Sequence, residues 1–193
     1  MRVLSIDPGI TYMGIAVLDI PDTPGPVTLI KRECIQGNKL LKHYRDIRGT
    51  YPDKFIIMIA FQDLFKDLIT QYEIEEVVSE GAFAHIRIAA FESLVRIIMV
   101  LQFALSLTIH KTLNVVSPQF VKKAWTGSGG KDVNKDDMRI VYLTKDYVLG
   151  DEDPESAAEH EIDAVAHGYA YACRDIWKTV LPEPKKPKKK KKT

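Results

Sequence analysis

The chain contains little cysteine and no long hydrophobic run. Its two cysteines, Cys34 and Cys173, are far apart in a chain of 193 residues. Such a sequence has no disulfide framework and favours a reducing compartment. The longest apolar stretch, residues 95–109, is interrupted by Arg96 and Gln102, and it is shorter than the roughly 20 apolar residues that a membrane-spanning helix needs. The start of the chain shows no signal-peptide pattern, so we expect an intracellular, cytoplasmic protein that does not bind a membrane.

Positive charge is scarce outside the last few residues. Seven of the 27 basic residues are lysines in the last nine positions, which leaves 20 basic against 26 acidic residues in residues 1–184. This acidic body excludes a uniformly basic DNA-coating protein. The length allows one domain with a real core but not two substantial domains. We therefore predict a single domain, residues 1–180, followed by a disordered lysine-rich tail, residues 181–193.

Short apolar segments bounded by turn residues predict strands early in the chain. Residues 3–7, 13–18 and 27–34 follow one another at short intervals, with Pro-Gly and proline-rich turns between them. This spacing indicates an antiparallel meander. Two further apolar segments, residues 74–79 and 113–116, predict a fourth and a fifth strand.

Helical periodicity accounts for most of the remaining residues. We predict helices in a charged stretch that ends near residue 72 and is divided by a loop near 49–53, and then at 85–108, 119–125, 135–149 and 154–178. The segment 85–108 is apolar nearly all round, so we expect it to be buried on more than one side. In the last helix, Asp153 is the expected N-cap and Pro154 the expected first helical residue. The predicted fold class is α/β, with a mixed five-stranded sheet flanked by helices.

Three acidic residues and a histidine are candidate site residues. Asp7 and Glu80 each end a predicted strand and precede a glycine-containing turn, and side chains at strand ends face the clefts of α/β sheets. Asp163 lies in an otherwise apolar helical segment, on the same face as His160 and His167. Taken singly, Asp7 is equally typical of a turn, Glu80 of a solvated strand end and His160 of a helix surface.

Taken together, these residues indicate a metal site. Carboxylates close to one another repel, and a divalent cation between them relieves the repulsion. Two such ions, about 3.5–4 Å apart, can stabilise the attacking and leaving oxygens of a phosphodiester. An imidazole among oxygen ligands tolerates manganese as well as magnesium. We therefore predict metal-assisted hydrolysis, with the following residues as both catalytic groups and metal ligands: Asp7, Glu80, His160 and Asp163.

Four segments of the chain resemble RuvC-type Holliday-junction resolvases. They occur in the order that the family has, and they are specific together although each alone is not. They are Ile6-Asp7-Pro8-Gly9 with Gly14-Ile15-Ala16-Val17; Val77-Val78-Ser79-Glu80 with Phe83; Val116-Ser117-Pro118-Gln119-Phe120-Val121-Lys122-Lys123 with Gly127-Ser128-Gly129; and His160-Glu161-Ile162-Asp163-Ala164-Val165-Ala166. The similarity is thin and covers about residues 1–177.

The resemblance implies an RNase H-like nuclease domain with two Mg²⁺ ions per site, which Mn²⁺ can replace. It also implies a homodimer that makes paired symmetric nicks in four-way DNA junctions and perhaps in other branched DNA. Asp7, Glu80 and Asp163 take the family's carboxylate roles, with Asp7 bridging both ions. His160 stands where many members have an aspartate and some a histidine, and it would bind a metal or orient the attacking water. The chain differs from the family in a longer segment between Cys34 and Ile74, a longer loop after Gly127 and the lysine tail.

Candidate DNA contacts gather around the glycine-rich loop after residue 126. Lys122, Lys123, Lys131 and Lys135 lie in or beside this loop, where the backbone can approach phosphates closely. By the resemblance, Lys122 and Lys135 match DNA-contacting lysines, whereas Lys123 and Lys131 are equally typical of a solvated face. Phe83 is expected to stack on or wedge between unpaired bases, the alternative being a core position.

Two regions have candidate roles outside the site. The apolar segment 85–108 is the expected dimer surface, with an ordinary core as the alternative. The lysine tail is expected to add salt-sensitive affinity for DNA. If the tail is instead a targeting signal, the protein belongs in the nucleus rather than in the cytoplasm of a bacterium or a virus-infected host cell; an incidental addition is the third interpretation.

Three other functions stay open at this point. Actin-like and sugar-kinase ATPases also begin with an Asp-x-Gly hairpin, but they need a second domain for which this chain has no room. A ribonuclease H that acts on RNA–DNA hybrids shares the fold and the carboxylates, and the segment 116–129 argues against it. A catalytically silent module for branched DNA is the third, because His160 replaces a carboxylate; the joint presence of Asp7, Glu80 and Asp163 argues against it.

Overall fold

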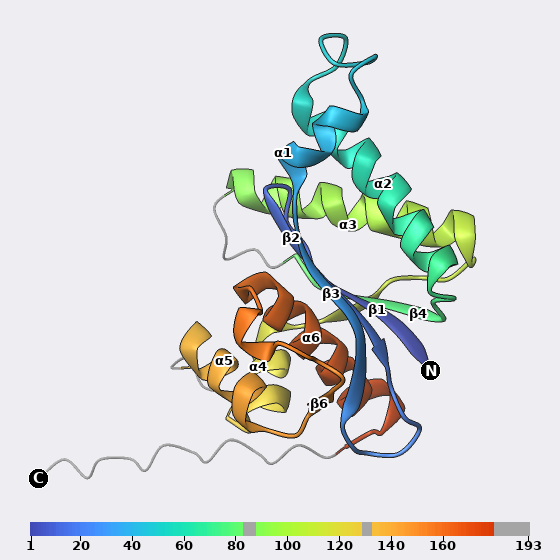
Figure 1. Ribbon diagram of the computed structural model, residues 1–193. Coiled ribbons are helices and arrows are strands. Elements are labelled where there is room, and N and C mark those ends of the chain that lie inside the picture. The colour runs from blue at the N-terminus through green and yellow to red at the C-terminus, as the bar shows by residue number, and fades with distance from the viewer. Residues whose placement is uncertain (83–87, 129–132, 180–193) are drawn as a thin grey trace, which may run out of the picture.

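The structure of the chain is a computed structural model, and it describes residues 1–82, 88–128 and 133–179 (Figure 1). A six-stranded sheet runs through it in the order β5-β4-β1-β2-β3-β6. The strands are β1 (Arg2–Asp7), β2 (Tyr12–Asp19), β3 (Val27–Gln36), β4 (Glu76–Glu80), β5 (Asn114–Val116) and β6 (Val148–Leu149). β1 to β3 form the predicted antiparallel meander, whereas β4 and β5 run parallel to β1, and β6 runs parallel to β3.

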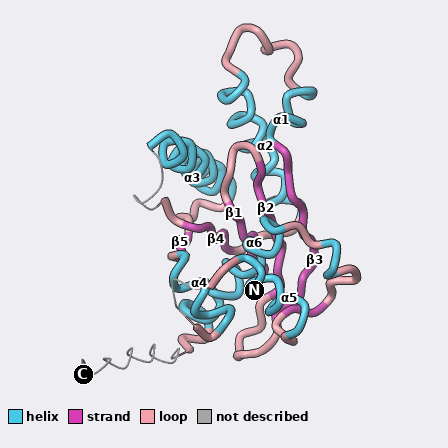
Figure 2. The backbone as a smooth tube through the Cα atoms, turned by 90° about the vertical axis from the view of Figure 1, so that its left-hand side faces the viewer, coloured by secondary structure: helices cyan, strands magenta, loops and turns pink. Residues whose placement is uncertain are grey.

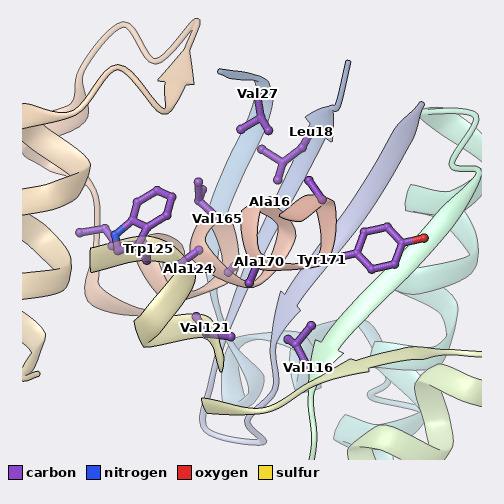
Figure 3. Packing of buried hydrophobic residues seen from close by; sticks show 14 of the residues in the cluster. Ala16, Leu18, Val27, Val116, Val121, Ala124, Trp125, Val165, Ala170 and Tyr171 are labelled. Carbon is purple, nitrogen blue, oxygen red and sulfur yellow. The ribbon is translucent and has the colours of Figure 1, made fainter. Parts of the chain in front are cut away.

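Helices cover both faces of the sheet. On one side lie α1 (Gly37–Leu40), a 3₁₀ turn (Leu41–His43), α2 (Asp53–Gln71) and α3 (Ile88–Thr108); on the other lie α4 (Pro118–Thr126), α5 (Lys135–Thr144) and α6 (Glu159–Tyr171). In Figure 2, α3 lies above β4 and β5, and α4 lies below them. Each side has its own hydrophobic cluster, and Figure 3 shows the one in which α6 packs on β2 and α4 packs on α6. The mixed sheet flanked by helices is therefore confirmed, with one strand more than predicted.

The extra strand corrects the prediction of a helix over residues 135–149. α5 ends at Thr144, and Lys145 already has an extended backbone with ψ of 139°. Val148 and Leu149 then pair with the start of β3 as the short edge strand β6. The edge of β3 gives these residues backbone partners in place of the hydrogen bonds of a longer helix.

The start of the last helix was also predicted wrongly. Pro154 begins a separate 3₁₀ turn (Pro154–Ser156), and the Asp153 side chain makes no capping hydrogen bond. α6 begins instead at Glu159, where the Glu161 carboxylate accepts a hydrogen bond from the Ala158 N–H at 2.9 Å. The regular helix is shorter than the predicted 154–178, because it ends at Tyr171 and continues as a π-helical turn (Ala172–Ile176).

α6 packs unusually close to the sheet because small residues face each other across the contact. A Cβ atom on Gly14 of β2 would lie 1.8 Å from the His160 carbonyl oxygen, and one on Gly168 would lie 2.3 Å from Leu18 Cδ1. The buried Ser5 hydroxyl donates a hydrogen bond of 2.5 Å to the Ala164 carbonyl. This close approach brings the first turn of α6 to the end of β1.

α3 is buried on one side only, which corrects the expectation of burial on several sides. Ile97, Leu101 and Leu105 are fully buried against the sheet and α2, while Met99, Phe103 and Leu107 are 52–63% exposed on the opposite face. The window Phe91–Thr108 passes the length and composition test for a membrane span, and only 22% of it is buried inside the chain. Within the part of the chain that the structure describes, this face of α3 is therefore left uncovered.

Candidate metal centre

Two carboxylates lie side by side because they end neighbouring parallel strands. β1 and β4 pair in register up to Ile6 and Ser79, so that the next residues, Asp7 and Glu80, emerge at the same edge of the sheet. Both side chains are mostly buried, with 14% and 27% of their surface exposed. The parallel pairing therefore creates the carboxylate pair that the two strand-end motifs predict.

The first turn of α6 adds an imidazole and a third carboxylate. Gly14 is the cross-strand partner of Asp7, and the His160 backbone lies directly over it. This contact lets His160 Nδ1 reach Asp7 Oδ2 at 2.6 Å. Asp163, one turn further along α6, lines the same cavity as Glu80. The charge of Asp7 affects the ionisation of Asp163, and the charge of Asp163 affects that of Glu80. The four predicted site residues thus come together.

An arginine on β3 holds the beginning of α6 in place. Arg32 donates to Glu161 Oε2 at 2.5 Å, to Asp151 Oδ2 at 2.9 Å and to the Asp153 carbonyl at 2.6 Å. Charge-assisted bonds of this kind, in a partly buried setting, are among the stronger polar contacts in proteins. They tie the loop before α6 and its first turn to the sheet, and so they position His160.

The electrostatics of the site are those of crowded carboxylates whose charges the nearby Lys122 and Lys135 only partly offset. Burial, followed by the charges of Asp7 and Asp163, raises the pKa of Glu80 to about 7. Burial, followed by the charge of Asp7, raises the pKa of Asp163 to about 6. The hydrogen bond to Asp7 raises the pKa of His160. Carboxylate oxygens that are held together in spite of their mutual repulsion are suitable ligands for Mg²⁺ or Mn²⁺, and a bound ion would relieve that repulsion.

One site residue was not among the predicted ligands. His167 is 97% buried on α6, with 3% of its surface exposed, and its Nε2 atom lies 3.7 Å from Glu80 Oε2. Asp7, Glu80 and His167 each offer a ligand atom within 4.8 Å of the others. In the sequence, His167 stands out only because it follows Asp163 by four residues and so shares its helical face. That spacing does not show that the His167 ring turns toward Glu80.

Two of the predicted DNA-contacting lysines lie at the site. Lys122 and Lys135 line a cavity of about 150 Å³ together with Glu80, Asp163 and His167. Lys122 donates to the Val133 carbonyl at 2.6 Å, and Lys135 pairs with Glu159. Both lysines thus line the same cavity as the carboxylates.

Among the remaining predicted DNA contacts, the structure describes only Lys123. Lys123 lines a separate hollow of about 400 Å³ with Gly127 and Trp177, so the structure does not place it beside Lys122 in the site. Phe83 and Lys131 lie outside the described residues.

An aromatic side chain covers the outer side of the imidazole. The Tyr12 ring stacks on the His160 ring, with centroids 5.9 Å apart and planes 9° from parallel. Both residues line an open cavity of about 450 Å³ that extends between the β1–β2 turn and the second turn of α3. The half-exposed Tyr12 ring offers a surface on which a base can stack.

Comparisons with known proteins agree with this architecture. No family model matches the chain, and no curated protein matches its sequence. Among solved structures, RuvC of T. thermophilus in complex with a Holliday junction substrate has a TM-score of 0.69 and 19% identity, covering 89% of this chain and 93% of that one. The yeast mitochondrial Holliday junction resolvase Ydc2 has a TM-score of 0.62 and 16% identity over 88% of this chain and 77% of that one.

A viral structure is similar over the same extent. The fowlpox virus Holliday junction resolvase has a TM-score of 0.57 and 15% identity, covering 89% of this chain and 97% of that one. At these identities the likeness shows the fold. The chain has the RNase H-like fold of RuvC-type resolvases, as the four sequence segments predicted.

Proposed function

We propose that this protein is a structure-selective DNA endonuclease that cleaves four-way junctions by metal-dependent phosphodiester hydrolysis. The observation that carries the proposal is the convergence of Asp7, Glu80, His160 and Asp163 at one edge of a RuvC-type fold. A fold alone supports many functions, and the site is what favours this one. The similar structures of named resolvases, one of them bound to junction DNA, support the choice of substrate.

Each of the four site residues has its own role in the proposed hydrolysis. Asp7 lies between Glu80 on one side and His160 on the other, so it would bridge two ions, with Glu80 and Asp163 each completing one position. Bound Mg²⁺ ions supply an activated water and stabilise charge on the phosphate oxygens. His160 uses Nδ1 to bond Asp7, which leaves Nε2 to bind an ion or to orient a water. Lys122 and Lys135 would contact the phosphates that flank the cleaved bond.

A two-fold dimer on the exposed face of α3 completes the proposal. Met99, Phe103 and Leu107 recur every four residues along this face and are 52–63% exposed. A second copy of the same helix would cover them, because a two-fold interface is self-complementary. The dimer would place one site on each of two opposed strands of the junction, which allows paired nicks.

The test is a nicking assay on a labelled four-way junction, a linear duplex of the same sequence and an RNA–DNA hybrid, each in Mg²⁺ and in Mn²⁺. We expect cleavage of the junction only, lost in Asp7→Asn and kept in Asp22→Asn, which changes an exposed aspartate in the β2–β3 turn. Cleavage of the hybrid alone would assign the protein to ribonuclease H chemistry. Tight junction binding without any cut would make it a silent binding module.

A further inference from the structure

The imidazole of His167 has a hydrogen bond on one side and none on the other. Its Nδ1 atom lies 3.1 Å from the Ile6 carbonyl oxygen. A carbonyl oxygen only accepts, so Nδ1 carries the proton and donates it. Nε2 lies 3.7 Å from Glu80 Oε2, which is beyond hydrogen-bond distance, and among the described residues the ring makes no other hydrogen bond.

This tautomer places a lone pair against a carboxylate. In the neutral ring, Nε2 is an acceptor aimed at Glu80, which is itself an acceptor when ionised. Two acceptors facing each other in a buried place repel unless a proton or a cation lies between them. A divalent cation between the two groups would bind both lone pairs, and His167 and Glu80 line the same cavity.

The surroundings of the ring match those of metal-binding histidines. Such a histidine usually donates its second ring N–H to a carboxylate or a backbone carbonyl, which sets its tautomer and orientation. In this chain the carbonyl is that of Ile6, the residue just before Asp7. One ring nitrogen of His167, one Asp7 oxygen and one Glu80 oxygen lie within 4.8 Å of one another. The adjoining cavity of about 150 Å³ leaves room for an ion and its remaining water ligands.

We propose that His167 is a metal ligand and that it divides the centre into two unlike positions. Asp7, Glu80 and His167 hold one ion, and Asp7, His160 and Asp163 hold the other. The three α6 residues follow at intervals of three and four along one helical face, so they lie in a row beside Asp7 and Glu80. This assignment rests on the proposed metal-dependent function and adds a nitrogen ligand at each position.

The alternative is that His167 is only a core residue that ties α6 to β1. In that case the hydrogen bond to Ile6 is its whole role, and metal binding does not depend on Nε2. Asparagine separates the two roles, because its amide N–H can replace the Nδ1 donor while no atom takes the place of Nε2. His167→Asn is thus the test variant. His160→Asn is the matched change at the other position, and His43→Asn, at an exposed histidine, is the neutral control.

The experiment measures Mn²⁺ binding rather than cleavage. Calorimetric titration counts the bound ions, and pulsed electron paramagnetic resonance detects imidazole nitrogen coupled to each ion. We expect the wild-type chain to bind two ions, both with nitrogen coupling. His167→Asn should weaken one ion at least about tenfold and remove one coupling. His160→Asn should remove the nitrogen coupling to the other ion. His43→Asn should leave both couplings unchanged.

A second measurement does not depend on how the buried variant folds. In His160→Asn, a remaining imidazole coupling is expected to come from His167. Its absence there would overturn the assignment, as would two unweakened ions in a folded His167→Asn. If the wild-type chain binds no Mn²⁺ at all, the proposed metal-dependent function fails together with it. Two bound ions that both lack coupling to His167 reject the ligand role alone.

Discussion

Replacing Glu80 by glutamine should stabilise the metal-free protein although it destroys the site. Burial and the charges of Asp7 and Asp163 raise the pKa of Glu80 from 4.5 to about 7. The unfolded chain therefore releases this proton at a lower pH than the folded chain does. The resulting destabilisation begins as the pH rises through 4.5 and is complete above about 7. The difference between the two pKa values corresponds to about 3 kcal/mol.

Urea denaturation in the presence of a chelator measures this effect. At about pH 8, Glu80→Gln should unfold with a free energy about 2–3 kcal/mol higher than the wild type, and at about pH 5 the gain should fall below about 1 kcal/mol. Saturating Mn²⁺ should reverse the order, because only the wild type binds the ion tightly. Glu76→Gln is the control on the same strand, and it should bring no gain, since Glu76 already pairs with Lys111 at 2.6 Å. A Glu80→Gln variant less stable than the wild type at pH 8 would refute the account of the site's electrostatics.

Three further changes test the packing, the dimer and the tail. Gly14→Ala puts a Cβ atom 1.8 Å from the His160 carbonyl oxygen, so it should lower the free energy of unfolding by about 3 kcal/mol and weaken Mn²⁺ binding. Gly25→Ala, where the nearest atom to the added Cβ is 3.9 Å away, should change neither the free energy of unfolding nor the Mn²⁺ affinity in the same titrations. Phe103→Glu should convert a dimer to a folded monomer in analytical ultracentrifugation, and an unchanged sedimentation coefficient would exclude α3 as the interface. Deletion of residues 185–193 removes seven lysines and should reduce the slope of log affinity for DNA against log salt by up to about 6; an unchanged slope would show that the tail does not touch DNA.

The sequence predicted the carboxylate pair because its signals are local. Asp7 follows a short apolar strand and precedes Pro-Gly, and Glu80 repeats the pattern before Gly81. The parallel pairing of β1 and β4 then places the two carboxylates side by side at one edge of the sheet. The meander of β1 to β3 was predictable for the same reason, since each turn carries its own proline and glycine.

The start of α6 was not predictable, because a distant residue decides it. Asp153 and Pro154 have the local features of a helix start. In the folded chain, Arg32 instead binds the Asp153 carbonyl and the Glu161 carboxylate from β3, more than 120 residues away in sequence. The helix therefore begins at Glu159, and no local sequence pattern indicates the contact between Arg32 and this segment.

Side-chain orientation limited the prediction of the site in a similar way. The spacing of His160, Asp163 and His167 predicts a shared helical face, but only the close contact at Gly14 determines how near that face lies to Asp7. Lys122 and Lys123 are neighbours in sequence, yet they line different cavities, because successive residues of α4 point in different directions.

The central claim, paired metal-dependent cleavage of four-way junctions, is tested most directly on a supercoiled plasmid that extrudes a cruciform. Two nicks made within one binding event convert the plasmid straight to the linear form, whereas independent nicks first accumulate the open circle. The account predicts linear product in Mg²⁺ without an open-circle phase, and no product with Asp7→Asn. Accumulation of open circle alone, or an intact plasmid despite tight binding to the junction, would contradict it.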